Sequence, residues 1–207
     1  IIKTRIQLWQ KDFRDFGPDT EVSKIISEDS IQLVDNEINR LSNLVNRLLR
    51  LSRPVAKKEL TNVNQLLEQS IALINSKIID QNITLRNEHD PKMPLVNLDP
   101  IAIGQVFLNL LMNSLEAMGK GENIFTRTVY NSKNKIAEII IEDTGKGIPD
   151  NLMENIFNPF FTTKEHGIGL GLSIAYEIIK AHDGKIEFIN HGQKGAMCRI
   201  TIPSANM

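Results

Sequence analysis

The chain has 207 residues, of which 41% are hydrophobic and 24% are charged, a composition typical of a folded globular protein. Its 24 basic and 25 acidic residues give a formal net charge of −1, which argues against a nucleic acid or an anionic membrane as a partner. The single cysteine, Cys198, excludes a disulfide scaffold and a cysteine-rich metal site. We expect no membrane contact, no signal peptide and a cytoplasmic location.

Residues 1–54 are predicted to form a helical hairpin. Apolar residues recur at spacings of three and four in two runs: Ile2, Ile6, Trp9, Phe13 and Phe16, then Ile31, Val34, Ile38, Leu41, Val45 and Leu48. A glycine and a proline within residues 17–20 separate the two runs. Because a two-helix hairpin leaves one apolar seam uncovered, we expect a homodimer in which two hairpins form a four-helix bundle. The alternative is a hairpin packed on the chain's own globular domain.

A second domain is predicted over residues 60–207, after a linker at 55–59. Pro54 cannot continue the second helix, and charged residues follow it. The predicted elements are a helix at 62–80, strands at 83–88 and 95–98, a helix at 100–118, strands at 124–130 and 136–142, a helix at 169–181, and strands at 185–190 and 196–202. Helices grouped between paired strands indicate an α+β fold, with a mixed sheet and helices on one face.

Two asparagines stand out on the predicted helix 100–118. Asn109 and Asn113 are one helical turn apart and therefore share a face. Buried amides need hydrogen-bond partners, and an asparagine oxygen is a suitable ligand for a Mg²⁺ ion that also carries phosphate oxygens. A pair of asparagines that caps the helix or tethers a loop is the alternative.

The strand predicted at 136–142 ends in an acid followed by glycines, in the sequence EDTGKGIP. Asp143 can accept a hydrogen bond from an amino group, and Gly145 and Gly147 allow the backbone to approach a flat ring closely. An ordinary Asp-Thr-Gly turn is the alternative for this motif taken alone.

Two further motifs precede the helix predicted at 169–181. The first, IFNPFFTTK, places three aromatic residues in a loop: Phe157, Phe160 and Phe161. Such residues can anchor a mobile cover over a site or form a hydrophobic cluster beneath the loop, and Lys164 follows them as a cation that can reach a phosphate. The second, GIGLGLS, contains glycines whose backbone N–H groups can face an anion: Gly167, Gly169 and Gly171. No strand directly precedes them, so the dinucleotide-binding fingerprint does not fit.

In this order the four motifs resemble the N box, first glycine box, F box and second glycine box of the ATP-binding catalytic domain of bacterial sensor histidine kinases. The matching segments are 109–117, 143–147, 157–161 and 167–171. The hairpin resembles the dimerisation and histidine phosphotransfer domain of the same kinases, so the resemblance covers nearly the whole chain. It implies a GHKL-type α/β sandwich that binds ATP with Mg²⁺, and a response-regulator receiver domain as a partner.

The resemblance also implies roles for single residues. Asp143 matches the acid that binds the adenine amino group, Asn113 the residue that coordinates Mg²⁺, and Asn109 its neighbour near the phosphates. Lys164 is implied as a γ-phosphate contact within the ATP lid, residues 148–166. The remaining expected nucleotide contacts are Gly145, Gly147, Ile148, Phe160, Gly167, Gly169, Gly171 and Leu172.

The phosphate-accepting histidine, which this family carries on the first hairpin helix, is missing, since no histidine precedes His89. We therefore expect a kinase that has lost this histidine by truncation, with a deletion as the alternative. It is expected to bind Mg·ATP but not to phosphorylate itself at the usual position. One alternative is an ATPase clamp of the gyrase and chaperone type, in which a glutamate one turn before the metal-binding asparagine activates water. Asn109 occupies that position here, and Glu116 is a less suitable substitute. The other alternative is a receiver-docking module without catalysis, against which the intact motifs argue.

Overall fold

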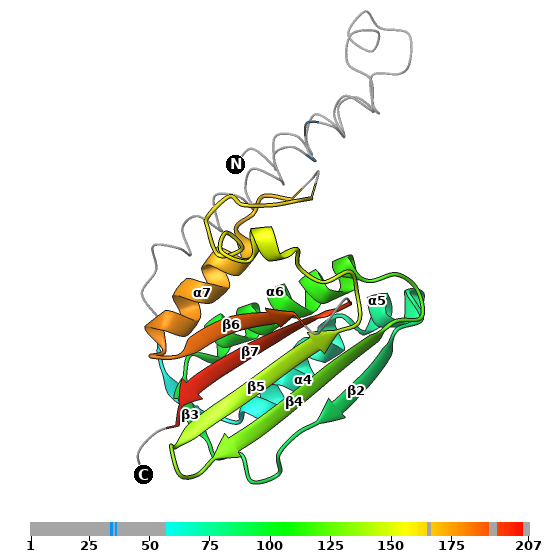
Figure 1. Cartoon of the computed structure of the whole chain (residues 1–207). Helices are drawn as coiled ribbons and strands as arrows, with labels where there is room; N and C mark the ends of the chain where they lie inside the picture. The colour runs from blue at the N-terminus through cyan, green and yellow to red at the C-terminus, as the bar shows by residue number, and fades with distance from the viewer. Residues whose placement is uncertain (1–33, 35, 37–56, 165–166, 191–193, 205–207) are drawn as a thin grey trace, which may run out of the picture. The chain divides into compact units, whose positions relative to one another are not determined.

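The computed structural model describes residues 34, 36, 57–164, 167–190 and 194–204 (Figure 1). The chain separates into two compact units, Ile1–Arg50 and Leu51–Met207, and nearly all described residues belong to the second. In the first unit the described residues Val34 and Asn36 are helical. The rest of the predicted hairpin, and hence its dimer, lies outside the described residues. The predicted domain boundaries stay predictions, although strand β1 already begins at Glu59 within the predicted linker.

Five strands form a mixed sheet in the order β2-β4-β5-β7-β6 (Figure 1). Strands β2 and β4 are parallel, and every other neighbouring pair is antiparallel. A separate two-stranded antiparallel sheet joins β1 and β3. The strands are β1 Glu59–Thr61, β2 Thr84–Glu88, β3 Val96–Leu98, β4 Asn123–Asn131, β5 Ile136–Asp143, β6 Lys185–Asn190 and β7 Ala196–Pro203.

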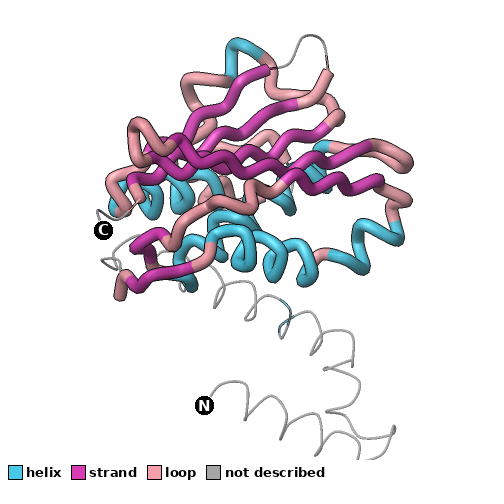
Figure 2. The backbone as a smooth tube through the Cα atoms, turned by 90° about the horizontal axis from the view of Figure 1, so that it is seen from below, coloured by secondary structure: helices cyan, strands magenta, loops and turns pink. Residues whose placement is uncertain are grey.

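The helices lie mainly on one side of the five-stranded sheet, as Figure 2 shows, and this confirms the predicted fold class. They are α4 Val63–Leu73, α5 Asn75–Asp80, α6 Pro100–Ala117 and α7 Gly171–Ala181, with a short 3-10 helix η1 at Asp150–Leu152. In the described part of the chain no helix is long and apolar enough to cross a bilayer.

The single helix predicted over residues 62–80 is wrong, because the backbone turns at Ile74 and separates α4 from α5. The Ile74 N–H bonds to Ile71 O, three residues back, instead of continuing the α-helical pattern. Apolar periodicity runs through the break, since Leu67, Ile71, Ile74 and Ile78 are all buried. The spacing of apolar residues therefore gave no sign of the turn.

Helix α6 forms the centre of the hydrophobic core. Its apolar face is completely or almost completely buried, together with the inward residues of the central strands: Ile103, Phe107 and Leu111 on α6, Ile139 and Ile141 on β5, and Ile200 and Ile202 on β7. Alternation along the strands sends every second residue toward this core. The packing brings the C-terminal half of α6 next to the end of β5.

A buried histidine connects the beginning of α6 to the end of α7. Asp99 caps α6, because its Oδ1 atom accepts hydrogen bonds from the N–H groups of Ile101 and Ala102, each at 3.0 Å. The Asp99 N–H donates to His182 Nε2 at 2.9 Å, and His182 Nδ1 lies 2.7 Å from Ile178 O. The ring is therefore neutral, with its proton on Nδ1 donated to the carbonyl oxygen.

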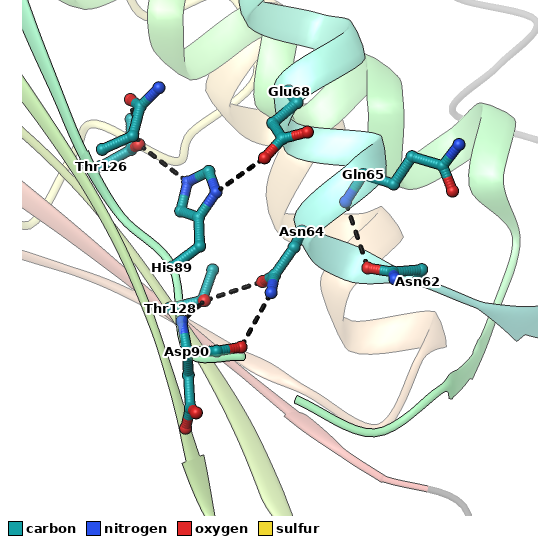
Figure 3. Close-up of polar contacts among 9 residues, drawn as sticks. Asn62, Asn64, Gln65, Glu68, His89, Asp90, Thr126 and Thr128 are labelled. Carbon is teal, nitrogen blue, oxygen red and sulfur yellow. Dashed lines mark hydrogen bonds and ion pairs between the residues drawn. The ribbon is translucent and has the colours of Figure 1, made fainter. Parts of the chain in front are cut away.

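Polar side chains join α4 to the sheet near the β2 edge (Figure 3). Asn64 on α4 donates to Asp90 O at 2.9 Å and accepts from the buried Thr128 hydroxyl at 2.8 Å. His89 lies between Glu68 and the buried Thr126 hydroxyl, at 3.3 and 3.2 Å. Both threonine hydroxyls thus have the partners that burial requires.

We predict that the stability of the chain depends on pH through His182. Burial lowers the pKa of His182 below its ordinary value of 6.5, because desolvation disfavours the charged ring. The unfolded chain then binds the proton more readily, so this contribution to stability is fully present above pH 6.5 and is lost as the pH falls through the lowered pKa. Urea unfolding between pH 7.5 and 5 is expected to show a smaller pH dependence in His182→Gln. An unchanged dependence in the variant would contradict the prediction.

Candidate functional site

The last residue of β5 carries a buried acid. Asp143 is 6% exposed, its Oδ2 atom accepts from the Ser114 hydroxyl on α6 at 3.0 Å, and its Oδ1 atom accepts from the Gly145 N–H at 3.0 Å. Burial raises the pKa of Asp143, and the hydrogen bonds from Ser114 and from the backbone of Gly145 and Ala196 oppose that change. The donors fix the orientation of the carboxyl group.

The loop after Asp143 runs tightly under the end of α6. The Lys146 N–H donates to Ala117 O at 3.2 Å, and a Cβ atom on Gly145 would lie 2.6 Å from that same oxygen. Gly147 has φ +70°, and a Cβ atom there would lie 2.9 Å from Gly195 O. A side chain on either residue would therefore meet protein backbone, which is why glycine is required here. The sequence interpretation had instead explained these glycines by the close approach of a flat ring.

Gly195, which the sequence analysis missed, completes this loop. Its N–H donates to Gly145 O at 2.7 Å, its φ is +86°, and a Cβ atom on it would collide with the Asp143 carbonyl oxygen. It directly precedes β7, where Ala196 pairs with Asp143. Gly195 lies beside the acid because β5 pairs with β7. The sequence offered a single sign of its role, which was a glycine directly before a predicted strand.

The two α6 asparagines contact different segments. Asn109 accepts from Gln105 Nε2 at 2.9 Å and donates to Gly171 O, at the beginning of α7, at 3.1 Å. It thus tethers the beginning of α7, where the sequence interpretation had offered the tethering of a loop as an alternative. The Asn113 oxygen instead accepts from Lys164 Nζ at 2.9 Å.

The same Lys164 ammonium also forms an ion pair with Glu116. Asn113 and Glu116 lie three residues apart on α6 and so project from one face of the helix. An amide oxygen and a carboxylate oxygen therefore share a single cation.

The aromatic residues of the predicted cover behave differently from one another. The Phe157 ring packs against Tyr176 and Phe188, with ring centroids 5.3 and 5.9 Å apart. Phe160 is 62% exposed and has φ +68°. The prediction that these aromatics anchor the loop fits Phe157 but is wrong for Phe160.

Most of the remaining predicted site residues lie in the segment that leads into α7. A Cβ atom on Gly169, which has φ +71°, would collide with the Phe160 backbone, whereas the nearest atom to one on Gly171 is Asn109 Cγ at 3.9 Å. Gly167 lies against the Thr162 side chain. Leu172 packs on the hydrophobic core, and Ile148 is half-buried.

Comparisons with known proteins identify the family of the chain. Residues 98–206 match the family described as histidine kinase-, DNA gyrase B- and HSP90-like ATPase. The catalytic domain of histidine kinase ThkA is 35% identical in a solved structure, with a TM-score of 0.65, 72% of this chain covered and 97% of that chain. The chain therefore belongs to this ATPase family, and its described second unit is a catalytic domain of the sensor histidine kinase type.

Curated relatives include longer sensor kinases. Sensor protein FixL of Bradyrhizobium diazoefficiens is 33% identical, with 86% of this chain and 36% of the relative covered. Sensory histidine kinase/phosphatase NtrB of Salmonella typhimurium is 35% identical, with 82% and 48% covered. The chain thus spans less than half the length of these relatives.

We predict that Gly195→Ala destabilises the chain by about 1–3 kcal/mol, because alanine adopts a positive φ only with strain and its Cβ would collide with the Asp143 carbonyl oxygen. Gly119→Ala is the matched control, since a Cβ atom at Gly119 has no neighbour within 4 Å. Chemical denaturation of both variants measures the difference. Equal stability of the two variants would contradict the proposed constraint.

Proposed function

We propose that the chain is the kinase core of a sensor histidine kinase, which binds Mg·ATP and transfers the γ-phosphate to a histidine for relay to a response-regulator aspartate. The observation that carries the proposal is the buried Asp143 carboxyl group, oriented by Ser114 and Gly145 at the end of β5. Membership of an ATPase family that includes histidine kinases supports the same reaction.

Asp143 is proposed to bind the adenine amino group. Ser114, Gly145 and Ala196 donate three hydrogen bonds to its carboxyl group. A carboxylate has about four acceptor sites, so it retains capacity for another donor. The walls of the nucleotide site are proposed to come from the two glycine loops and their neighbours: Gly145, Gly147, Ile148, Phe160, Gly167, Gly169, Gly171 and Leu172.

Asn113 is proposed as the Mg²⁺ ligand. Its amide oxygen already contacts a cation, the Lys164 ammonium, and this supports its suitability for a metal ion. When bound, Mg²⁺ supplies charge neutralisation to the polyphosphate, the main requirement of phosphoryl transfer. Lys164 is proposed to contact the γ-phosphate, and Asn109 to hold the beginning of α7 beside the phosphates.

The phosphate-accepting histidine is proposed to lie on polypeptide other than these 207 residues. No histidine precedes His89 in the sequence, and His89 and His182 are both held in hydrogen bonds inside the catalytic domain. We further propose a homodimer through residues 1–54 and a receiver-domain partner. The proposal of a receiver-domain partner draws on a solved complex of histidine kinase ThkA with response regulator protein TrrA. This chain matches that structure with 30% identity and a TM-score of 0.71, over 98% of this chain and 57% of that chain.

Asp143→Asn is expected to weaken ATP binding by about ten- to a hundredfold, the value of one to two charge-assisted hydrogen bonds. Ser114, Gly145 and Ala196 all donate to this carboxyl group, so the NH₂ group of the new asparagine would face a donor and not an acceptor. Titration with a fluorescent ATP analogue measures the change, with the exposed Asp80→Asn as a charge-matched control. Affinity within twofold of the unsubstituted chain would remove Asp143 from the adenine site.

A longer polypeptide of the same protein, with on the order of 20 additional upstream residues to extend the first helix, tests the reaction itself. With Mg²⁺ and ATP radiolabelled at the γ-phosphate, acid-labile label is expected on the longer polypeptide and not on the 207-residue chain. Label on the 207-residue chain would contradict an external acceptor. No label on either, with ATP binding intact, would favour an ATPase or a docking module.

A further inference from the structure

The Lys164 ammonium donates to two oxygens of α6 that differ in charge. The Asn113 amide oxygen is a neutral acceptor at 2.9 Å, and the Glu116 carboxylate is the charged partner in an ion pair. Because Asn113 alone offers a single neutral hydrogen bond, the charge of Glu116 supplies most of the attraction for the ammonium. Glu116 thus determines where the end of the lysine side chain lies.

The backbone of Lys164 is also held in place. Its N–H donates to Thr162 Oγ1 at 3.1 Å, and its carbonyl oxygen accepts from the Gly167 N–H at 3.1 Å. The side chain therefore extends to α6 from a backbone held by these two hydrogen bonds, and the contact joins residues about fifty positions apart in the sequence. A local contact between neighbours in the chain cannot account for it.

The side chains of Lys164 and Glu116 are 43% and 47% exposed, so water reaches both groups. An ion pair of this exposure is weak and can exchange with another cation or anion. The contact is strong enough to bias the position of the lysine and weak enough to open when a ligand arrives.

We infer that Glu116 positions Lys164 on the Asn113 oxygen, so that the lysine ammonium and Mg²⁺ are alternative partners of that one oxygen. The inference rests on the proposed function, in which Asn113 ligates Mg²⁺. Binding of a Mg·nucleotide then displaces the Lys164 ammonium from the Asn113 oxygen, and the displaced ammonium is available to a phosphate. Glu116 is a positioning residue, since it acts through Lys164 and not on the nucleotide.

The test uses the affinity for a fluorescent ADP analogue, measured by titration in Mg²⁺ and again in EDTA. The ratio of the two dissociation constants reports how much Mg²⁺ strengthens binding. Lys164→Met removes the competing ammonium and Glu116→Gln releases it, so each variant is expected to raise the ratio about two- to fivefold, the range for an exposed ion pair. Lys164→Arg retains a cation and is expected to keep the ratio close to that of the unsubstituted chain.

The double variant Glu116→Gln/Lys164→Met separates positioning from a direct effect of the acid. If Glu116 acts through Lys164, the double variant shows no increase beyond Lys164→Met alone. Lys133→Met, in the exposed turn between β4 and β5, controls for the loss of one positive charge. Thermal unfolding of each variant checks that it is folded.

Two results would overturn the inference and leave the proposed function standing. The first is an unchanged ratio in Lys164→Met. The second is an increase from Glu116→Gln in the Lys164→Met background that equals its increase in the unsubstituted chain. Failure of the unsubstituted chain to bind the ADP analogue in either buffer would overturn the proposed function together with the inference. The two kinds of failure are therefore distinguishable in one experiment.

Discussion

The hydrogen bond between the Ser114 hydroxyl and the Asp143 carboxyl group connects the main helix to the end of the central strand. A carboxyl group that is 6% exposed requires donors, since burial of an unpaired charge is costly. The Ser114 hydroxyl on α6, which precedes Asp143 in the sequence, and the Gly145 N–H, which follows it, donate to this carboxyl group. The position of the acid therefore depends on α6 and β5 together. The glycines of the loop after Asp143, and Gly195 beside it, follow from that constraint, because a side chain there would meet protein backbone.

Helix α6 is suited to carry the site because both of its ends are held. Asp99 and His182 fix its beginning, and the Lys146 N–H bonded to Ala117 O fixes its end. Between these points, the face with Asn109, Asn113 and Glu116 presents oxygen atoms at helical spacing. Side chains on a helix that is packed along its length keep their relative positions better than side chains on a loop.

The sequence predicted the mixed sheet, the one-sided helices and the long α6, because alternation and helical periodicity are local properties of the chain. It did not predict the turn at Ile74, the exposure of Phe160 or the place of Gly195. The place of Gly195 depends on contacts between distant segments, which local patterns do not report. Gly195 reaches Asp143 only through the pairing of β5 with β7, and Asn109 acts as a tether only because α7 begins beside it.

The charges around Asn113 explain why the lysine ammonium lies there. Lys164 and Glu116 form a neutral pair, so neither the ammonium nor the carboxylate at this face of α6 lacks a counter-charge. A polyphosphate with its metal ion brings both an anion for the lysine and a cation for the amide oxygen, and so replaces each half of the contact with Asn113. After this exchange the lysine and the Asn113 oxygen each have a new partner, whereas Glu116 has lost its own. There the side chain is 47% exposed, so water can solvate the carboxylate once the lysine turns to the phosphate.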